Sequence, residues 1–161
     1  MKRATFAAIA ATALCMLLLA ACGSGGPVRR VSDPAAGIQQ LSVRADGSWS
    51  LDLRLDNFSS IPMRFDAVDL AMTVQGQPPA TLRTNPGFTI GPESADVATL
   101  QLVPPAGAKI AIADALARGG TISYELKGTI TATPEDGKPR VFEFERGNAL
   151  APVPGLPGVM R

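Results

Sequence analysis

Few side chains in this sequence are arranged for catalysis. The chain has 161 residues and no histidine, which removes the Ser-His-Asp and Cys-His arrangements and the commonest general base. Ser59 and Ser60 offer two adjacent hydroxyl groups, but no base stands in a recognisable relation to them that would make either one a nucleophile. The sequence therefore predicts no catalytic residues, and an enzyme is the least favoured class of function.

Acidic side chains are the next candidates, as ligands of a metal ion or as an acid–base pair. Four aspartates fall in or beside apolar segments: Asp52, Asp56, Asp66 and Asp69. Their spacing matches no calcium-binding loop. Glu143 and Glu145 alternate with an apolar residue in the manner of a solvated strand face. We therefore predict solvated carboxylates, no metal site and no cofactor.

The overall charge excludes a further class of partner. Lysine and arginine number 15 against 14 aspartates and glutamates, whereas nucleic-acid binding needs a clearly basic face. We expect no nucleic-acid partner.

One thiol, that of Cys22, lies in a recognisable chemical motif. Two basic residues precede an uncharged, mostly apolar run from residue 4 to residue 21, which is the pattern of a secretory signal. The run ends in Leu19-Ala20-Ala21-Cys22, and this string resembles the lipobox of bacterial lipoproteins. In that family the cysteine thiol is diacylated, the chain is cut before the cysteine, and the new amino group is acylated. The resemblance implies cleavage between Ala21 and Cys22, lipidation at Cys22 and a signal peptide over residues 1–21.

The lipobox resemblance also implies a location. A single acyl chain binds a bilayer only marginally, whereas several make the attachment effectively permanent, so the membrane becomes a partner through the acyl chains. In lipoproteins with this motif, aspartate after the cysteine favours retention in the inner membrane. Gly23 stands at that sorting position, and we expect attachment to the periplasmic face of the outer membrane in a Gram-negative source. Two alternatives are an uncleaved signal anchor and a cleavage that releases a soluble protein.

Residues 22–37 are expected to form a lipidated, flexible tether. The segment after the cysteine is rich in glycine, proline and serine and has little to bury. A flexible chain of this length spans on the order of 20 Å, which keeps the following domain close to the bilayer. Arg29 and Arg30 are interpreted as solvated charges of this tether, with contacts to lipid phosphates as the alternative.

Alternating apolar and polar residues predict β-strands in the rest of the chain. The clearest example is Trp49–Asn57, in which apolar and polar residues alternate from Trp49 to Asp56, so one face is buried and the other faces solvent. Asp46-Gly47 before it favours a hairpin with residues 38–45. A change of phase after Phe65 predicts a bulge near Asp66-Ala67.

These segments together predict an all-β fold. About six to eight short strands, each with one buried face, are typical of an antiparallel sandwich or barrel. We predict an antiparallel immunoglobulin/fibronectin-like β-sandwich of about seven strands over residues 38–147, with one short helix over residues 108–118 that ends before Gly119. An eight-stranded ligand barrel is the alternative fold. Residues 148–161 form a tail rich in proline and glycine that lies extended over the domain or hangs free.

The turn after Trp49–Asn57 contains two residues with an expected structural role. Asparagine bonds to nearby backbone in turns, and proline fixes the backbone angle φ. Asn57 and Pro62 are therefore expected to hold the turn. A ligand-binding role for Asn57 is the alternative.

Several motifs follow one another in a characteristic order. They are Leu51–Met63, an apolar strand ending near Gly76, Thr89–Ser94, the strand from Leu100 to Pro104, Tyr124–Gly128, and Phe144 with Gly147. This order resembles that of type 2 late embryogenesis abundant proteins, the water-stress and hypersensitive-response domain, over residues 38–147. Phe58 stands where that family usually has proline. The resemblance implies a sandwich of about seven strands with a short helix, acting as a stress-protective or binding module.

The anchor and the family resemblance lead to one expected function. We expect a periplasm-facing lipoprotein with a non-catalytic binding or protective module in envelope stress or desiccation tolerance, with an envelope protein or a lipid as partner. The alternative is a carrier that holds a lipid or another hydrophobic ligand in an apolar groove between the sheets.

Overall fold

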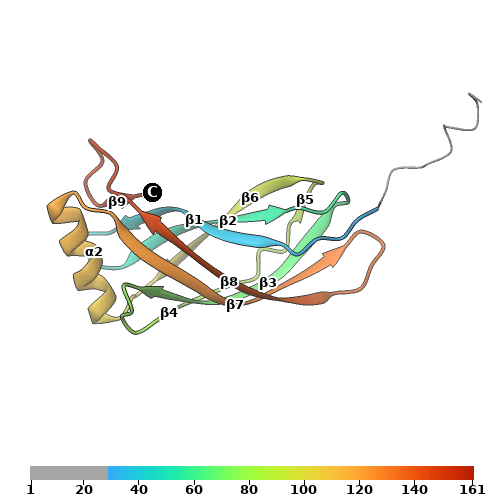
Figure 1. The fold of residues 1–161 in the computed structure, drawn as a ribbon, viewed down its shortest axis with the longest axis horizontal. Coiled ribbons are helices and arrows are strands. Elements are labelled where there is room, and N and C mark those ends of the chain that lie inside the picture. The colour runs from blue at the N-terminus through green and yellow to red at the C-terminus, as the bar shows by residue number, and fades with distance from the viewer. Residues whose placement is uncertain (1–28) are drawn as a thin grey trace, which may run out of the picture.

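Two antiparallel β-sheets face each other in the computed structural model, which describes residues 29–161 (Figure 1). The elements are β1 (Ala35–Val43), β2 (Trp49–Asn57), β3 (Met63–Val74), β4 (Ala80–Thr84), β5 (Thr89–Ile90), β6 (Ser94–Leu102), α2 (Ala106–Arg118), β7 (Ile122–Pro134), β8 (Arg140–Leu150) and β9 (Val159–Met160). Sheet A has the strand order β6-β2-β1-β9, and sheet B has the order β4-β3-β7-β8 with β5 paired to β3. The expected signal peptide, Cys22 and Gly23 lie outside the described residues.

The predicted antiparallel sandwich is confirmed, with more strands than expected. Residues 29–161 contain nine strands and one helix, against an expectation of about seven strands. Two of the nine, β5 and β9, are only two residues long. Such short pairings leave no alternating pattern in a sequence, because period two needs several residues to become visible.

Local sequence signals account for the first hairpin and for a bend in sheet B. β1 and β2 pair antiparallel as predicted. In the turn between them, Oδ1 of Asp46 accepts hydrogen bonds from the backbone N–H and the hydroxyl of Ser48, at 2.9 and 2.6 Å. The predicted bulge is also present, because the register of β3 against β7 shifts between Phe65 and Ala67.

The backbones of β3 and β7 approach each other closely at Gly128. In register, Gly128 lies between Leu70 of β3 and Phe144 of β8. A Cβ atom at this position would lie 2.2 Å from the carbonyl oxygen of Asp69, far inside van der Waals contact. Glycine is therefore required for the two strands to pair without interruption.

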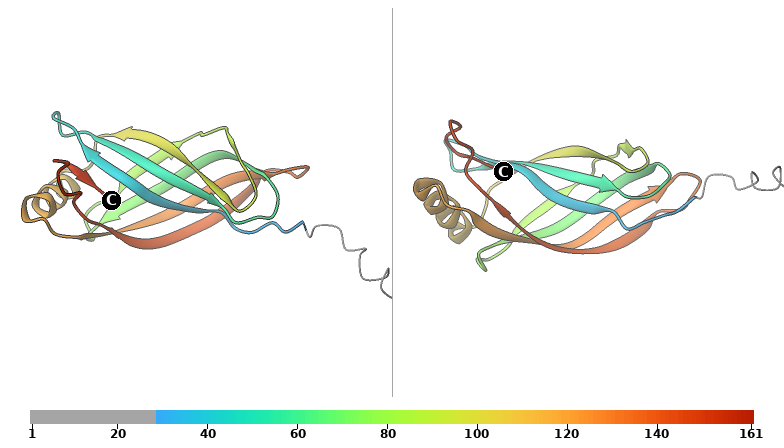
Figure 2. Two further views of the ribbon diagram at one scale, coloured as in Figure 1. Left: turned by 90° about the horizontal axis from the view of Figure 1, so that it is seen from above. Right: turned by 45° about the horizontal axis from the view of Figure 1, so that its top comes forward.

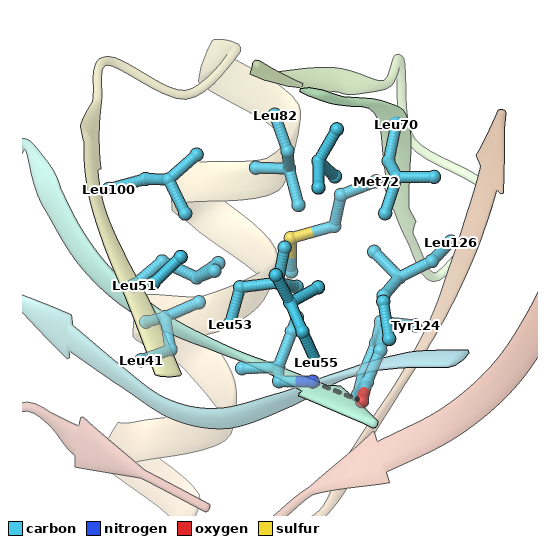
Figure 3. Packing of buried hydrophobic residues seen from close by; sticks show 14 of the residues in the cluster. Leu41, Leu51, Leu53, Leu55, Leu70, Met72, Leu82, Leu100, Tyr124 and Leu126 are labelled. Carbon is cyan, nitrogen blue, oxygen red and sulfur yellow. Dashed lines mark hydrogen bonds between the residues drawn. The ribbon is translucent and has the colours of Figure 1, made fainter. Parts of the chain in front are cut away.

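Apolar side chains fill the space between the two sheets (Figure 3). The labelled residues in that view are Leu41, Leu51, Leu53, Leu55, Leu70, Met72, Leu82, Leu100, Tyr124 and Leu126. One polar contact crosses this core, since the backbone N–H of Ile38 donates a hydrogen bond to the Tyr124 hydroxyl at 3.1 Å. β1 of sheet A is thereby linked to β7 of sheet B.

The helix α2 covers one end of the sandwich (Figures 1 and 2). Its buried side chains are Ala108, Ile112 and Ala115. It starts at Ala106 rather than at residue 108, and it ends as predicted, with Gly119 in the left-handed conformation at φ 65°. Within the described part of the chain, no helix combines the length and the apolar character needed to cross a membrane.

The outer strands of the sandwich extend beyond the expected borders of the domain. β1 begins at Ala35 rather than at residue 38, and β8 continues to Leu150 instead of ending at residue 147. The expected tail folds back on itself, because Ala151 and Arg161 exchange backbone hydrogen bonds and β9 pairs with β1. Figure 2 shows the chain entering at the end opposite α2 and the C-terminal segment lying beside the helix end.

Candidate functional site

The four aspartates considered as a metal or acid–base cluster do not come together. β2 carries Asp52 and Asp56 in sheet A, whereas β3 carries Asp66 and Asp69 in sheet B. Each carboxylate has a neighbour of its own: Thr99 for Asp52, Arg54 for Asp56, Thr133 for Asp66 and Arg83 for Asp69. Across residues 29–161, no group of three or more His, Cys, Asp or Glu residues is placed to hold a metal ion.

The two serines considered as nucleophiles hold the entering chain. Ser59 is fully buried, and its Oγ accepts a hydrogen bond from the backbone N–H of Ser32 at 3.0 Å and donates one to Sδ of Met63 at 2.9 Å. Ser60 Oγ accepts a hydrogen bond from the backbone N–H of Arg30 at 2.8 Å, and the backbone N–H of Ser60 donates to the Arg30 carbonyl at 3.0 Å. Residues 30–32 are therefore fastened to the turn between β2 and β3.

Asn57 lies at the centre of this turn. Its side chain is fully buried, and Nδ2 donates to the carbonyl oxygens of Ile61, Ile90 and Gly91 at 2.9, 3.1 and 2.9 Å. Its Oδ1 accepts a hydrogen bond from the backbone N–H of Ser59 at 2.9 Å. A single amide group thus joins the β2–β3 turn to the segment that follows β5.

Pro62 joins a third turn to the same place. Its carbonyl oxygen accepts a hydrogen bond from the backbone N–H of Glu135 at 2.9 Å, in the turn between β7 and β8. We call this end of the sandwich the tether end, comprising residues 29–33 and the turns 57–62, 91–93 and 134–137. The sequence contains the turn signals, but the pairing of the three turns depends on residues far apart along the chain.

Arg29 and Arg30 are part of the tether end and are not merely solvated. Arg29 Nη2 lies 3.4 Å from Glu135 and 3.3 Å from Asp136. Arg30 Nη2 donates to the carbonyl oxygen of Phe58 at 3.2 Å and lies 3.7 Å from Glu93. Such exposed ion pairs are individually weak. The acidic partners were missed by sequence reasoning because Arg29 and its partners are 106 and 107 positions apart.

Phe58 is the exposed apolar residue of the tether end. Its side chain is 48% exposed, and it lines a surface hollow of about 310 Å³ together with Arg30, Arg54, Glu93 and Ser94. The neighbours of Phe58 on either side are buried. An aromatic ring is therefore held at the surface between arginine side chains.

The opposite end of the molecule, which we call the α2 end, comprises α2 and residues 151–158. A shallow hollow of about 470 Å³ lies there between the last turn of α2 and the C-terminal hairpin, lined by Leu116, Val153 and Leu156 among others. Ile110 of α2 is also strongly exposed. The α2 end thus offers apolar surface beside a hairpin that is closed by backbone hydrogen bonds, such as that from the Leu156 N–H to the Val153 carbonyl oxygen at 3.1 Å.

A third hollow, of about 700 Å³, lies on sheet B and is polar. Its lining includes Thr73, Ser123, Glu125, Glu145 and Gly147. Lys127 Nζ lies 2.7 Å from Glu145, and this hydrogen bond lowers the pKa of the Glu145 carboxyl. Glu143, on the same strand, is exposed as expected for a solvated face.

The space between the sheets, where the carrier hypothesis places a ligand, is occupied by side chains. Leu41, Leu51 and Leu53 on sheet A and Met72 on sheet B have no exposed surface. The three hollows described above lie on the outside of the sandwich. Among residues 29–161, the inner faces of the sheets pack against each other instead of lining an apolar groove.

Comparison with known protein families identifies the domain. The profile of the type 2 family described as late embryogenesis abundant protein matches residues 52–142, which is more than half of the chain. The chain belongs to this family. In this late embryogenesis abundant protein the match runs from β2 into β8, so β1, the entering segment and the C-terminal hairpin lie outside it.

Solved structures show similarity at low sequence identity to this late embryogenesis abundant protein. A crystal structure of a protein from Archaeoglobus fulgidus covers 77% of this chain and 98% of its own, with 17% identity and a TM-score of 0.43. A protein from Bordetella pertussis covers 81% of this chain and 100% of its own, with 14% identity and a TM-score of 0.45. A solution structure from Arabidopsis thaliana covers 79% and 82%, with 16% identity and a TM-score of 0.43. No curated protein sequence matches the chain significantly.

Proposed function

We propose that this late embryogenesis abundant protein is a lipid-anchored lipoprotein of the bacterial envelope, with a sandwich that acts as a non-catalytic binding or protective module beside a bilayer. Its role is in envelope stress or desiccation tolerance. Gly23 after the cysteine supports the periplasmic face of the outer membrane as the site of attachment.

One observation carries this proposal. The chain segment that follows the lipobox Leu19-Ala20-Ala21-Cys22 is bonded to one end of the sandwich from Arg29 onward. Seven residue steps separate Cys22 from Arg29, and at about 3.5 Å per residue they span no more than about 25 Å. Acylation of Cys22 would hold the tether end within that distance of the bilayer.

The non-catalytic part of the proposal has its own support. The hydroxyl groups of Ser59 and Ser60 are engaged in hydrogen bonds that fasten residues 30–32. The carboxylates of Asp52 and Asp69 lie on different sheets and have separate partners. Catalysis by a nucleophile and a base requires the two to be within hydrogen-bond reach of each other.

Metabolic labelling with an alkyne fatty acid tests the anchor. The wild-type protein should incorporate the label and sediment with membranes, whereas Cys22→Ser should incorporate no label and should keep its leader. Cys15→Ser is the matched control, because it removes the other cysteine of the chain and should leave labelling unchanged. Labelling or normal maturation of Cys22→Ser would overturn the anchor.

Survival assays test the role. A deletion strain should lose viability after drying or osmotic shock, and the wild-type gene should restore it, while the Cys22→Ser gene should not. Survival of the deletion strain at the parental level would overturn the stress role and leave the anchor intact.

A further inference from the structure

We propose that the tether end, together with the adjoining Arg54 of β2, is itself a bilayer-docking surface, in which the Phe58 ring enters the boundary between lipid headgroups and acyl chains while Arg30 and Arg54 meet lipid phosphates. This inference rests on the proposed lipidation of Cys22. It adds an orientation to the anchor: the sandwich stands on its tether end with α2 pointing away from the bilayer.

The short chain between the lipidation site and the sandwich restricts which surface reaches the lipid. The tether end lies within about 25 Å of an acylated Cys22. β7 has 13 residues and runs from the α2 end to the tether end, so the sandwich is about 40 Å long. In an upright domain the apolar residues of the α2 end, such as Ile110, therefore lie beyond reach of the bilayer, whereas Phe58 faces it.

Phe58 is held outward by the turn that carries it. The Asn57 amide is locked by four hydrogen bonds, and Ser59 is fully buried. Arg30 Nη2 fixes the carbonyl oxygen of Phe58 at 3.2 Å. Phe58 is itself 48% exposed, so its ring is available for another contact. An aromatic ring beside long basic side chains suits the interfacial region of a bilayer.

The arginines beside the ring can exchange their partners for lipid phosphates. Arg54 Nε lies 2.9 Å from Asp56, and Arg30 Nη2 lies 3.7 Å from Glu93. The side chains of both arginines are more than half exposed. Guanidinium forms paired hydrogen bonds with phosphate oxygens as it does with carboxylates.

Such a small surface binds lipid only weakly on its own. One aromatic ring and two arginines fall short of the two strong signals that stable membrane attachment needs. A short tether raises the effective concentration of the surface at the bilayer to about the millimolar range. The docking should therefore appear in the lipidated protein and be nearly absent from a chain that lacks the acyl groups.

Depth-dependent fluorescence quenching tests the docking. The purified lipidated protein with Phe58→Trp is reconstituted into vesicles of phosphatidylethanolamine and phosphatidylglycerol, with and without a lipid that carries a shallow doxyl quencher. The added tryptophan should lose on the order of half its emission and shift to the blue, as expected for a ring at the interface. Trp49, the only tryptophan of the natural chain, is buried and serves as an internal reference for folding.

Ile110→Trp is the matched control at the α2 end, where the natural residue is also exposed. Quenching of the tryptophan at position 58 alone supports the docking. No quenching at either position in protein that floats with the vesicles overturns the docking and leaves the anchor standing. Quenching at both positions shows a domain lying flat, which also overturns it. Protein that fails to float overturns both proposals together.

Discussion

The two ends of the sandwich are closed by different forces. At the tether end, the fully buried Asn57 and Ser59 tie two turns and the entering chain together through hydrogen bonds, and the Pro62 carbonyl oxygen joins the third turn. At the α2 end, a helix is held by the apolar side chains of Ala108, Ile112 and Ala115. Hydrogen bonds fix distance and direction, whereas apolar packing is tolerant of small shifts. The comparison indicates that the end nearest the proposed anchor is the one whose geometry is specified most sharply.

The strongest test of this comparison is Asn57→Ala. It removes a buried amide and leaves the carbonyl oxygens of Ile61, Ile90 and Gly91 without their donor, so the free energy of unfolding should fall by about 4 kcal/mol. Urea denaturation followed by Trp49 fluorescence measures the loss. The exposed Asn85 provides the control, since Asn85→Ala should change stability by less than about 0.5 kcal/mol. Equal effects of the two substitutions on the free energy of unfolding would contradict the stabilising role assigned to Asn57.

A packing defect at the α2 end should lower the free energy of unfolding less than Asn57→Ala does. Ile112→Ala removes a side chain that is 1% exposed, and the cavity and lost transfer free energy should lower the free energy of unfolding by about 3 kcal/mol. The neighbouring Ile110 is 70% exposed, so Ile110→Ala serves as the paired control and should be nearly neutral. Hydrogen exchange should show the effect of Ile112→Ala in α2 before it appears at the turn of Asn57.

High pH should lower the free energy of unfolding through Tyr124, because its ionised form is poorly solvated in the core. Burial raises the pKa of the Tyr124 hydroxyl above its ordinary value of 10.0. Because the folded protein holds this proton more tightly than the unfolded chain, the contribution to stability is complete below pH 10 and is lost as pH rises through the folded pKa. Tyr124 is the only tyrosine, so the ultraviolet absorbance of tyrosinate reports its titration directly.

Tyr124→Phe gives the companion result. Loss of the acceptor for the Ile38 N–H should lower the free energy of unfolding by about 1 kcal/mol at neutral pH. Between neutral and high pH, the free energy of unfolding should also fall less in this variant than in the wild-type protein, because the variant has no hydroxyl at position 124 to titrate. A pKa of Tyr124 in the folded protein that is equal to or lower than its pKa in urea would contradict the predicted direction of the shift.

The smallest effect is expected from Ser60→Ala. The hydroxyl accepts the backbone N–H of Arg30, and its removal should loosen residues 30–32 while lowering global stability by about 1 kcal/mol or less. Faster hydrogen exchange at Arg30 with an almost unchanged urea midpoint is the expected result. A large shift of the midpoint would show that the entering chain contributes to the core and not only to the tether end.

Sequence patterns predicted the parts of the fold that depend on near neighbours. The alternation that begins at Trp49, the phase change at Asp66 and the stop at Gly119 are each visible in a few consecutive residues, and the structure shows the corresponding strand, bulge and helix end. The docking of Arg29 onto Glu135 and the hairpin that returns Met160 to β1 depend on pairs more than a hundred positions apart. No local propensity encodes such pairs, so the sequence alone gives no sign that these two segments are bonded to the sandwich.

In the candidate site, too, some features are visible in the local sequence and others depend on residues far apart along the chain. Turn chemistry pointed to Asn57, but its acceptors Ile90 and Gly91 lie 33 and 34 positions away and carry no signal of their own. In the sequence, Phe58 stands out only as a departure from a family pattern. Its exposure between two arginines follows from the arrangement of the turns, which becomes visible only in three dimensions.

The narrow gap between β3 and β7 at Gly128 has an evolutionary consequence. A position where even a methyl group would collide with the neighbouring carbonyl oxygen can accept no other amino acid while the two strands stay paired. Relatives that differ from this chain at the solvent-facing positions of sheet B should still have glycine at the position of Gly128. An alignment in which that column varies would mean that their sheets are bent or broken at this point.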